Sequence, residues 1–169
     1  MYYIGTYEKQ DVLSMNAFRY PKLTLSVQFR TKMFGTHRAL LPRARIAIWV
    51  RTALLKHSAE LTIRFVDEQE GRTLNYRYRR KNYATNVLTF SYGKLHNTVI
   101  GGDLVLCCPV VASEAHKQHK SLDAHYAHLI VHGVLHAQGF DHKNDEQASE
   151  MESIEKDILI KLGYLDPYI

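Results

Sequence analysis

The stretch from His132 to His142, which reads His-Gly-Val-Leu-His-Ala-Gln-Gly-Phe-Asp-His, constrains the fold of this chain more than any other. His132 and His136 are four residues apart, so on a helix their imidazoles project from one face about one turn apart. Gly139 predicts the end of that helix, because glycine readily adopts the left-handed conformation that reverses a chain. The next two residues carry the chain round so that His142 can face the other histidines. Three converging imidazoles are the ligand set of a catalytic zinc, whose fourth position is kept for water or substrate.

The spacing His-x3-His-x5-His, with a glycine after the second histidine, is much more specific than a histidine pair at helical spacing. The alternative is a helix whose histidines lie at a polar edge of the core. His125 and His128 continue the same stripe upstream, and the chain holds 10 histidines in all. A ligand a turn or two before His132 would lie too far along the helix axis. We therefore interpret His125 and His128 as structural residues or as residues that orient the ligands.

A general base is missing from the position where zinc proteases carry one. In their helix motif the residue after the first histidine is a glutamate, whereas this chain has Gly133 there. A peptidase interpretation thus loses its proton acceptor, although a metal that lowers the pKa of its bound water needs less help from a base. The nearest carboxylate is Asp141. We expect it to cap the turn, rather than to orient a ligand histidine or, last in order, to act as a base.

These residues resemble the YbeY family of bacterial endoribonucleases and rRNA maturation factors, whose signature is His-Gly-x-Leu-His-x-x-Gly-Tyr-Asp-His. Phe140 stands at the position of the usual tyrosine. Other departures are Asn82 and Ala84 in place of Asp and Pro, and Ser91 in place of Pro, and they affect loop shape more than the ligands. Further blocks follow in family order, and together with the signature they cover roughly residues 60–169: Leu-Asn-Tyr-Arg-Tyr-Arg-Arg-Lys (74–81), Thr-Asn-Val-Leu-Thr-Phe (85–90), Gly-Asp-Leu-Val (102–105), Leu-Gly-Tyr (162–164) and Asp-Pro-Tyr (166–168).

The resemblance implies a metal-dependent endoribonuclease that prefers single strands and acts in rRNA maturation and ribosome quality control. Its partners would be RNA, namely the small-subunit rRNA precursor, together with the ribosome and ribosomal proteins. We expect one zinc per chain, held by His132, His136 and His142. Arg79 lies in the block that resembles the one with the family's invariant arginine, and we expect it to bind the scissile phosphate. From the residues alone Arg79 does not differ from Arg77 or Arg80.

The mechanism and two other functions stay open at this point. The metal would either polarise a phosphoryl oxygen or supply hydroxide, and either water or the RNA 2′-hydroxyl would attack. One alternative function is a metal hydrolase with a non-RNA substrate, including peptides. The other is a non-catalytic ribosome-assembly factor with a structural metal.

The composition is typical of one folded domain inside a cell. The 169 residues suffice for one core, and 46% of them are hydrophobic. No apolar run reaches membrane length, and residues 1–10 contain no hydrophobic block of a signal peptide. We therefore expect a cytoplasmic protein without a membrane partner. Cys107 and Cys108 are adjacent, and if both lay on a strand they would point to opposite faces. We interpret them as small buried residues of a reducing compartment.

The net charge of +5 is modest, but its placement is uneven. No acidic residue lies between Asp11 and Glu60, or from Gly71 to Gly102, whereas both runs are rich in Lys and Arg. Acidic residues follow the histidine motif instead. The pattern indicates one face that attracts a polyanion and another that faces away from it, although solvated helix faces would give the same pattern. The acidic group comprises Asp145, Glu146, Glu150, Glu152, Glu155 and Asp157.

Hydrophobic periodicity predicts an α+β fold: a single domain with a mixed sheet of about four strands packed against helices. The central helix carries the metal ligands. Residues 1–22 are expected to be an extension of uncertain order, and residues 23–169 the single metal-dependent hydrolase domain. The predicted strands cover residues 24–30, 61–65, 87–92 and 99–108. The predicted helices start at Pro42, span residues 68–79, 109–119 and 122–138, and run from the N-cap Asn144 to Gly163.

Overall fold

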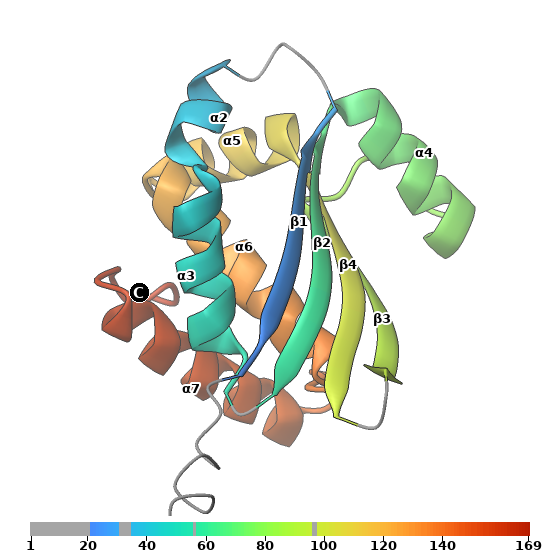
Figure 1. Cartoon of the computed structure of the whole chain (residues 1–169). Coiled ribbons are helices and arrows are strands. Elements are labelled where there is room, and N and C mark those ends of the chain that lie inside the picture. Colours follow the sequence, from blue (N-terminus) through green and yellow to red (C-terminus); the bar gives the residue numbers. More distant parts are fainter. Residues whose placement is uncertain (1–20, 31–34, 56, 96–97) are drawn as a thin grey trace, which may run out of the picture.

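The structure is a computed structural model that describes residues 21–30, 35–55, 57–95 and 98–169 (Figure 1). The predicted extension over residues 1–22 lies outside the described residues except for its last two. The described strands form one mixed sheet in the order β1-β2-β4-β3. β1 (Leu23–Phe29), β2 (Ser58–Val66) and β4 (Val99–Cys107) are parallel, and β3 (Val87–Leu95) runs antiparallel to β4 at the edge. The predicted α+β architecture is confirmed.

Most of the described helices lie on one side of the sheet, and one lies on the other side (Figure 1). The first group comprises α3 (Arg43–Ala53), α5 (Cys108–Lys117), α6 (Leu122–Ala137) and α7 (Asp145–Lys161). Within this group α7 packs on α6 and α3. α4 (Glu68–Arg79) lies on the opposite face, and the short helix α2 (Gly35–Leu40) precedes α3. The sequence analysis did not predict α2, which buries none of its residues and so lacks an apolar stripe.

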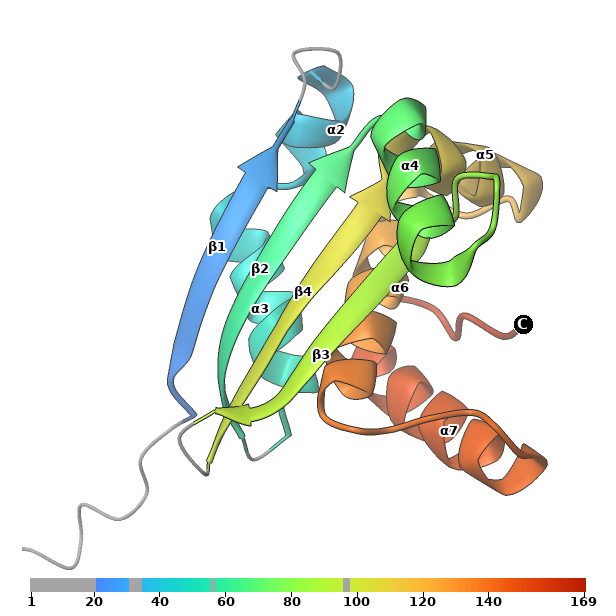
Figure 2. The ribbon, with the colours of Figure 1, turned by 90° about the vertical axis from the view of Figure 1, so that its right-hand side faces the viewer.

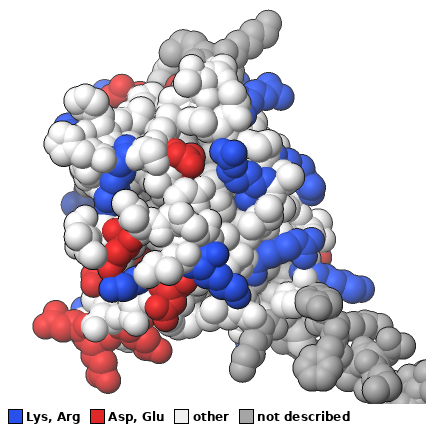
Figure 3. All heavy atoms as spheres, turned by 90° about the vertical axis from the view of Figure 1, so that its left-hand side faces the viewer, with Lys and Arg blue, Asp and Glu red and all other residues white. Residues whose placement is uncertain are grey.

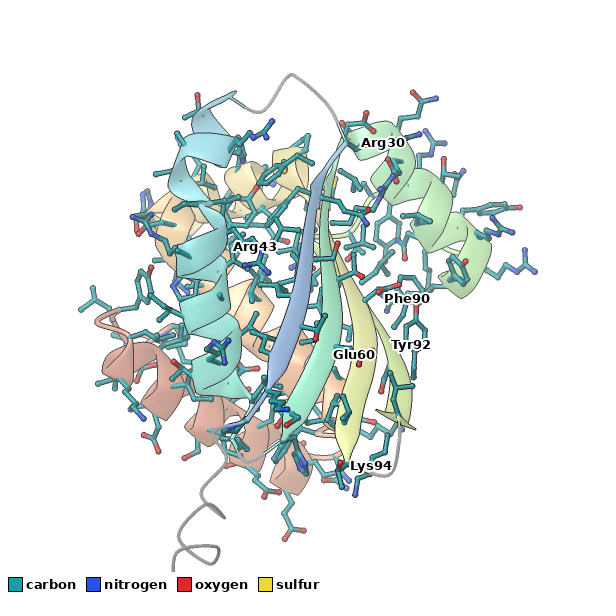
Figure 4. The ribbon with its side chains drawn as sticks, in the orientation of Figure 1. Arg30, Arg43, Glu60, Phe90, Tyr92 and Lys94 are labelled. Atoms are coloured by element: carbon teal, nitrogen blue, oxygen red, sulfur yellow. The ribbon has the colours of Figure 1, made fainter. Side chains whose placement is uncertain are left out.

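The main core lies between the sheet and the helices on its covered face. Leu61, Ile63 and Phe65 of β2 point into it, and the intervening residues of β2 are more exposed. α6 is the central helix, because ten of its 16 residues are buried. Figure 4 shows Phe90 and Tyr92 of β3 on the side of the sheet that faces α4, whereas Lys94 lies at the far end of the strand, away from α4. The central, buried position predicted for the ligand-bearing helix is confirmed.

Helix ends follow the predicted caps. The Asn144 side chain accepts a hydrogen bond from the Gln147 N–H at 2.9 Å, as the N-cap prediction requires. Asp67 caps α4 in the same way, accepting from the Glu70 N–H at 2.8 Å. The predicted end of the fourth strand is wrong by one residue, since Cys108 already belongs to α5. The reason is Pro109, whose ring favours the first turn of a helix. Both cysteines are free and buried.

Candidate metal centre

The three histidines of the motif meet beside β3, where α6 ends and the chain turns toward α7 (Figure 2). His132 and His136 occupy the last two turns of α6, and Gly139 has the positive φ of +98° predicted for the turn. The chain reversal brings the His142 ring to 5.0 Å from that of His136 and 5.8 Å from that of His132, between centroids. One nitrogen from each ring lies within 4.8 Å of the others. The structure thus brings together all three predicted ligands.

His132 is held from behind by a buried carboxylate. Its Nδ1 lies 2.6 Å from Glu155 Oε1, and Glu155, on α7, is 0% exposed. The other carboxylate oxygen contacts His128 Nε2 at 3.1 Å and accepts a hydrogen bond from the Tyr168 hydroxyl. Burial by itself would raise the pKa of Glu155, but the hydrogen bonds from these three side chains and the charge of His132 outweigh it and lower the pKa to about 2. Glu155 is therefore an ionised carboxylate that accepts hydrogen bonds from its neighbours.

His136 is oriented by the backbone. Its Nδ1 lies 2.9 Å from the Phe140 carbonyl oxygen, across the turn that Gly139 makes. Burial lowers the pKa of His136, and the neighbouring His132 lowers it further, so the ring favours the neutral form that binds metals. The turn therefore brings His142 toward the other two histidines and also orients the His136 ring.

The tautomers that these contacts impose leave two lone pairs facing each other. A carboxylate and a carbonyl only accept hydrogen bonds, so the Nδ1 atoms of His132 and His136 must carry the protons. When both rings are neutral, as metal binding requires, their Nε2 atoms are bare, and they lie 3.0 Å apart. Two imidazole lone pairs at that separation repel each other unless a cation lies between or beside them. The donor set therefore fits a metal ion bound by the Nε2 atoms of His132 and His136 and a nitrogen of the exposed His142.

Asp141 stays outside the histidine cluster. Its Oδ1 accepts from the His142 N–H at 2.8 Å, and its Oδ2 lies 2.7 Å from Lys143 Nζ. The hydrogen bond from Lys143 and that from the His142 backbone lower the pKa of Asp141. These contacts are those of a turn cap. Within the described part of the chain, the three histidines gather without a fourth His, Cys, Asp or Glu donor.

Arg79 lines the same cavity as the three histidines, although it comes from α4 on the other side of the sheet edge. The cavity measures about 540 Å³ and is also bordered by β3. Arg77 instead lies over the Tyr78 ring, 5.8 Å from its centroid, and Arg80 forms the left-handed C-cap of α4 with φ +59°. The structure thus distinguishes three arginines that the sequence alone did not, because Arg79 is the one of the three that lines the cavity.

Gly133 faces the sheet rather than the cavity. A Cβ at this position would lie 2.5 Å from Leu104 Cδ2 and 3.0 Å from Thr89 Oγ1. Because Leu104 is fully buried in β4, little room exists for any side chain there. A glutamate in the manner of zinc proteases does not fit this packing.

Two residues that border the site escaped the sequence analysis. Glu155 was counted among the acidic residues that face away from a polyanion, and this interpretation is wrong because Glu155 is buried against His132. The available signal was its place on the apolar stripe of α7, four residues after Met151 and three before Ile158. Ser91, described above only as a departure from the family pattern, donates its hydroxyl to the Ala137 carbonyl at 3.2 Å and so joins β3 to the end of α6.

Sequence comparisons agree with this geometry. A model of the family described as Endoribonuclease YbeY matches residues 36–163. The chain is 57% identical over 151 residues to Endoribonuclease YbeY of Paraburkholderia phymatum, and 58% identical over 151 residues to that of Paraburkholderia phytofirmans. Each alignment covers 89% of this chain and 98% of the relative. The relative from Cupriavidus necator is 57% identical over 148 residues, which are 88% of this chain and 74% of that protein.

A solved structure shares the fold. The solution structure of TM1509 from Thermotoga maritima matches with a TM-score of 0.59 at 21% identity, covering 82% of this chain and 89% of that one. Among the described helices, none is both long and apolar enough to cross a membrane.

Proposed function

Since the chain belongs to the YbeY family of endoribonucleases, we propose that it cleaves single-stranded RNA at one zinc ion held by His132, His136 and His142. RNA cleavage itself follows from the family. The choice of zinc is supported by the all-imidazole donor set, which suits this metal. The preference for single strands is supported by the resemblance alone.

The observation that carries the proposal is the pair of facing Nε2 atoms 3.0 Å apart. Glu155 and the Phe140 carbonyl accept hydrogen bonds from the two Nδ1 atoms, so in their neutral forms neither ring can donate to the other. A bound divalent ion resolves the repulsion and would supply Lewis-acid chemistry for phosphodiester cleavage. Glu155, in turn, makes the His132 ring more basic and holds its direction.

In the proposed reaction, Arg79 binds the scissile phosphate. Its guanidinium makes no hydrogen bond or ion pair with the described residues, so its donors are available to phosphate oxygens. A fixed cation at this place offsets the negative charge that grows on the phosphoryl oxygens in the transition state. The neutral His136 ring contributes no competing positive charge beside the metal position.

We further propose that the RNA is the small-subunit rRNA precursor, that the protein works in the cytoplasm with the ribosome and ribosomal proteins, and that it serves rRNA maturation and ribosome quality control. The family resemblance supports these assignments. The basic segment that follows α4, with Arg80 and Lys81 exposed beside the cavity-lining Thr85 and Asn86, fits a polyanionic substrate.

The proposal is tested by zinc content and RNA cleavage in four proteins: wild type, His136→Ala, Arg79→Ala and, as the matched control, Arg77→Ala. We expect about one zinc per wild-type chain, lost in His136→Ala. Arg79→Ala should keep its zinc and lose cleavage by roughly 100- to 1000-fold, as when one transition-state donor is removed. Arg77→Ala should retain most activity.

Several outcomes would contradict the proposal. Cleavage that survives in His136→Ala would show that the histidine site is not responsible. Peptide hydrolysis without RNA cleavage would favour the alternative hydrolase, which Gly133 and its packing against Leu104 make unfavourable. Full function of Arg79→Ala in the cell would favour a ribosome-assembly factor with a structural metal.

A further inference from the structure

A second cavity, of about 430 Å³, adjoins the metal centre. It shares Asn86, Val87 and His132 with the first cavity, so the two meet at the side of His132 that faces α5. Its far wall is built from α5 and the first turns of α6, which contribute Glu114 and His125. A strand of RNA whose phosphate lies at the metal centre therefore has room beside it for one more group.

The Glu114 carboxylate in this wall is held from two sides. Asn86 Nδ2 donates to its Oε2 at 3.0 Å, and His125 Nε2 lies 2.9 Å from the same oxygen. Asn86 is itself oriented, because its Oδ1 accepts from the Val87 N–H at 2.6 Å. His125 is only 3% exposed, whereas the Glu114 side chain is 30% exposed. The carboxylate is thus fixed from behind and open toward the cavity.

Holding the Glu114 carboxylate leaves a buried nitrogen atom of His125 without a hydrogen-bond partner among the described residues. Because Nε2 of His125 must donate to Glu114, its Nδ1 is a bare acceptor, and this buried atom has no hydrogen-bond partner within the described part of the chain. Buried polar atoms are nearly always paired, so an unpaired one needs an explanation. The His125 ring makes its one hydrogen bond to Glu114, just as His128, whose Nδ1 is also unpaired over the described ranges, makes its own to Glu155.

The charged and hydrogen-bonding groups that line the second cavity determine which ligand can bind there. A phosphate is repelled by the Glu114 carboxylate and by that of Glu152, which lines the same cavity. A carboxylate with free lone pairs accepts N–H donors instead. In single-stranded RNA such donors lie on the Watson–Crick edges of unstacked bases. Because Oε2 of Glu114 already accepts from Asn86 and His125, its open acceptor is Oε1, which Asn86 Nδ2 contacts only at 3.3 Å. Guanine offers two donors side by side, at N1 and N2, which can converge on this one oxygen.

We propose that this cavity binds a guanine next to the cleaved phosphodiester, with Glu114 accepting from the N1–H and N2–H groups. The inference rests on the proposed RNA cleavage and adds a base preference to it. Asn86 and His125 act as positioning residues, since they contact Glu114 rather than the base.

The test compares kcat/KM for short RNAs that carry guanine, inosine, 2-aminopurine or adenine on either side of one cleaved bond. Inosine lacks the N2 amino group and 2-aminopurine lacks the N1–H. In the wild type, guanine on one side should be preferred over adenine by about five- to 150-fold, with both analogues in between. Because this series uses the unaltered protein, it does not depend on any variant's folding.

Two variants then test whether Glu114 is the residue that causes the preference for guanine. Glu114→Gln should bring the guanine-to-adenine ratio close to one, and Glu152→Gln should leave it unchanged. Glu152 is the matched control, since it is an exposed glutamate of α7 that lines the same cavity. Equal cleavage of all four RNAs by the wild type, or an equal loss of preference in both variants, would overturn the proposal while leaving RNA cleavage intact. A wild type that cleaves none of the RNAs would instead refute the proposed function, and this inference with it.

Discussion

His132 illustrates how a single ligand side chain depends on residues that never touch the metal position. Its Nδ1 contacts Glu155, and Glu155 in turn contacts His128 and Tyr168. Tyr168, which follows α7 in the chain, is therefore coupled to a ring on α6 through one buried carboxylate. Such a carboxylate–histidine pair fixes both the tautomer and the direction of a ligand.

Replacing Glu155 with Gln should weaken zinc binding by roughly 10- to 100-fold, because the amide carries no charge and one of its two atoms can no longer accept. The dissociation constant can be measured by competition with a chelating dye, with circular dichroism to verify the fold. Glu150→Gln, an exposed change on the same helix, is the control. Equal zinc affinity in the two variants would show that Glu155 does not orient His132.

At the scale of elements, the close approach of α6 to the sheet places the ligands beside β3. Gly133 allows this approach, since its missing Cβ leaves room for Leu104 of β4. The same glycine removes the general base of the zinc-protease motif. Gly133 thus allows the helix to pack closely on the sheet and also leaves the site without the general base of the zinc-protease motif.

Gly133→Ala should lower the free energy of unfolding by about 1–3 kcal/mol, despite the better helix propensity of alanine, because a methyl group is forced against a filled core. Urea unfolding at a constant m-value measures the change. Leu104→Ala alone should also destabilise, by about 2–5 kcal/mol. The double variant should lose less than the sum, because each change relieves the other. Strict additivity would contradict the proposed overlap.

For the whole molecule, the excess of 22 basic over 17 acidic residues is unevenly distributed. Figure 3 shows a cluster of acidic side chains at the lower left corner of the face that it presents, with a few others at its centre and top, whereas Lys and Arg side chains are spread more widely. The segment after α4 is basic, and α4 and α7 lie on opposite sides of the sheet (Figure 1). RNA binding should therefore depend on where a charge lies and not only on the net charge.

Two charge reversals test this dependence. Lys81→Glu and Lys161→Glu each change the net charge from +5 to +3, and both lysines are exposed. In a His136→Ala background, in which we expect no cleavage, Lys81→Glu should weaken binding to single-stranded RNA by roughly fivefold at 0.1 M salt and flatten the salt dependence. Lys161→Glu should change it little. Fluorescence anisotropy measures both, and equal effects would argue against a directed basic surface.

Most helices and strands could be predicted from the sequence, because the spacing of hydrophobic residues reflects local structure. The expected helix over residues 68–79 agrees with α4, and the Asn144 cap with the start of α7. Prediction failed where local signals are weak, as at α2, which buries nothing, or where position in space matters, as for the buried Glu155.

The sequence by itself determined the three histidines, the turn at Gly139 and the order along the chain of the strands and of the helices other than α2, because spacing along a helix or through a tight turn follows from local geometry. Only the tertiary structure decided which arginine borders the histidines, which carboxylate holds His132, and that Gly133 faces the sheet. Arg79 and Glu155 lie 53 residues before and 23 after His132 in the chain. No local rule relates residues so far apart, because their meeting depends on how the sheet, α4 and α7 pack around α6.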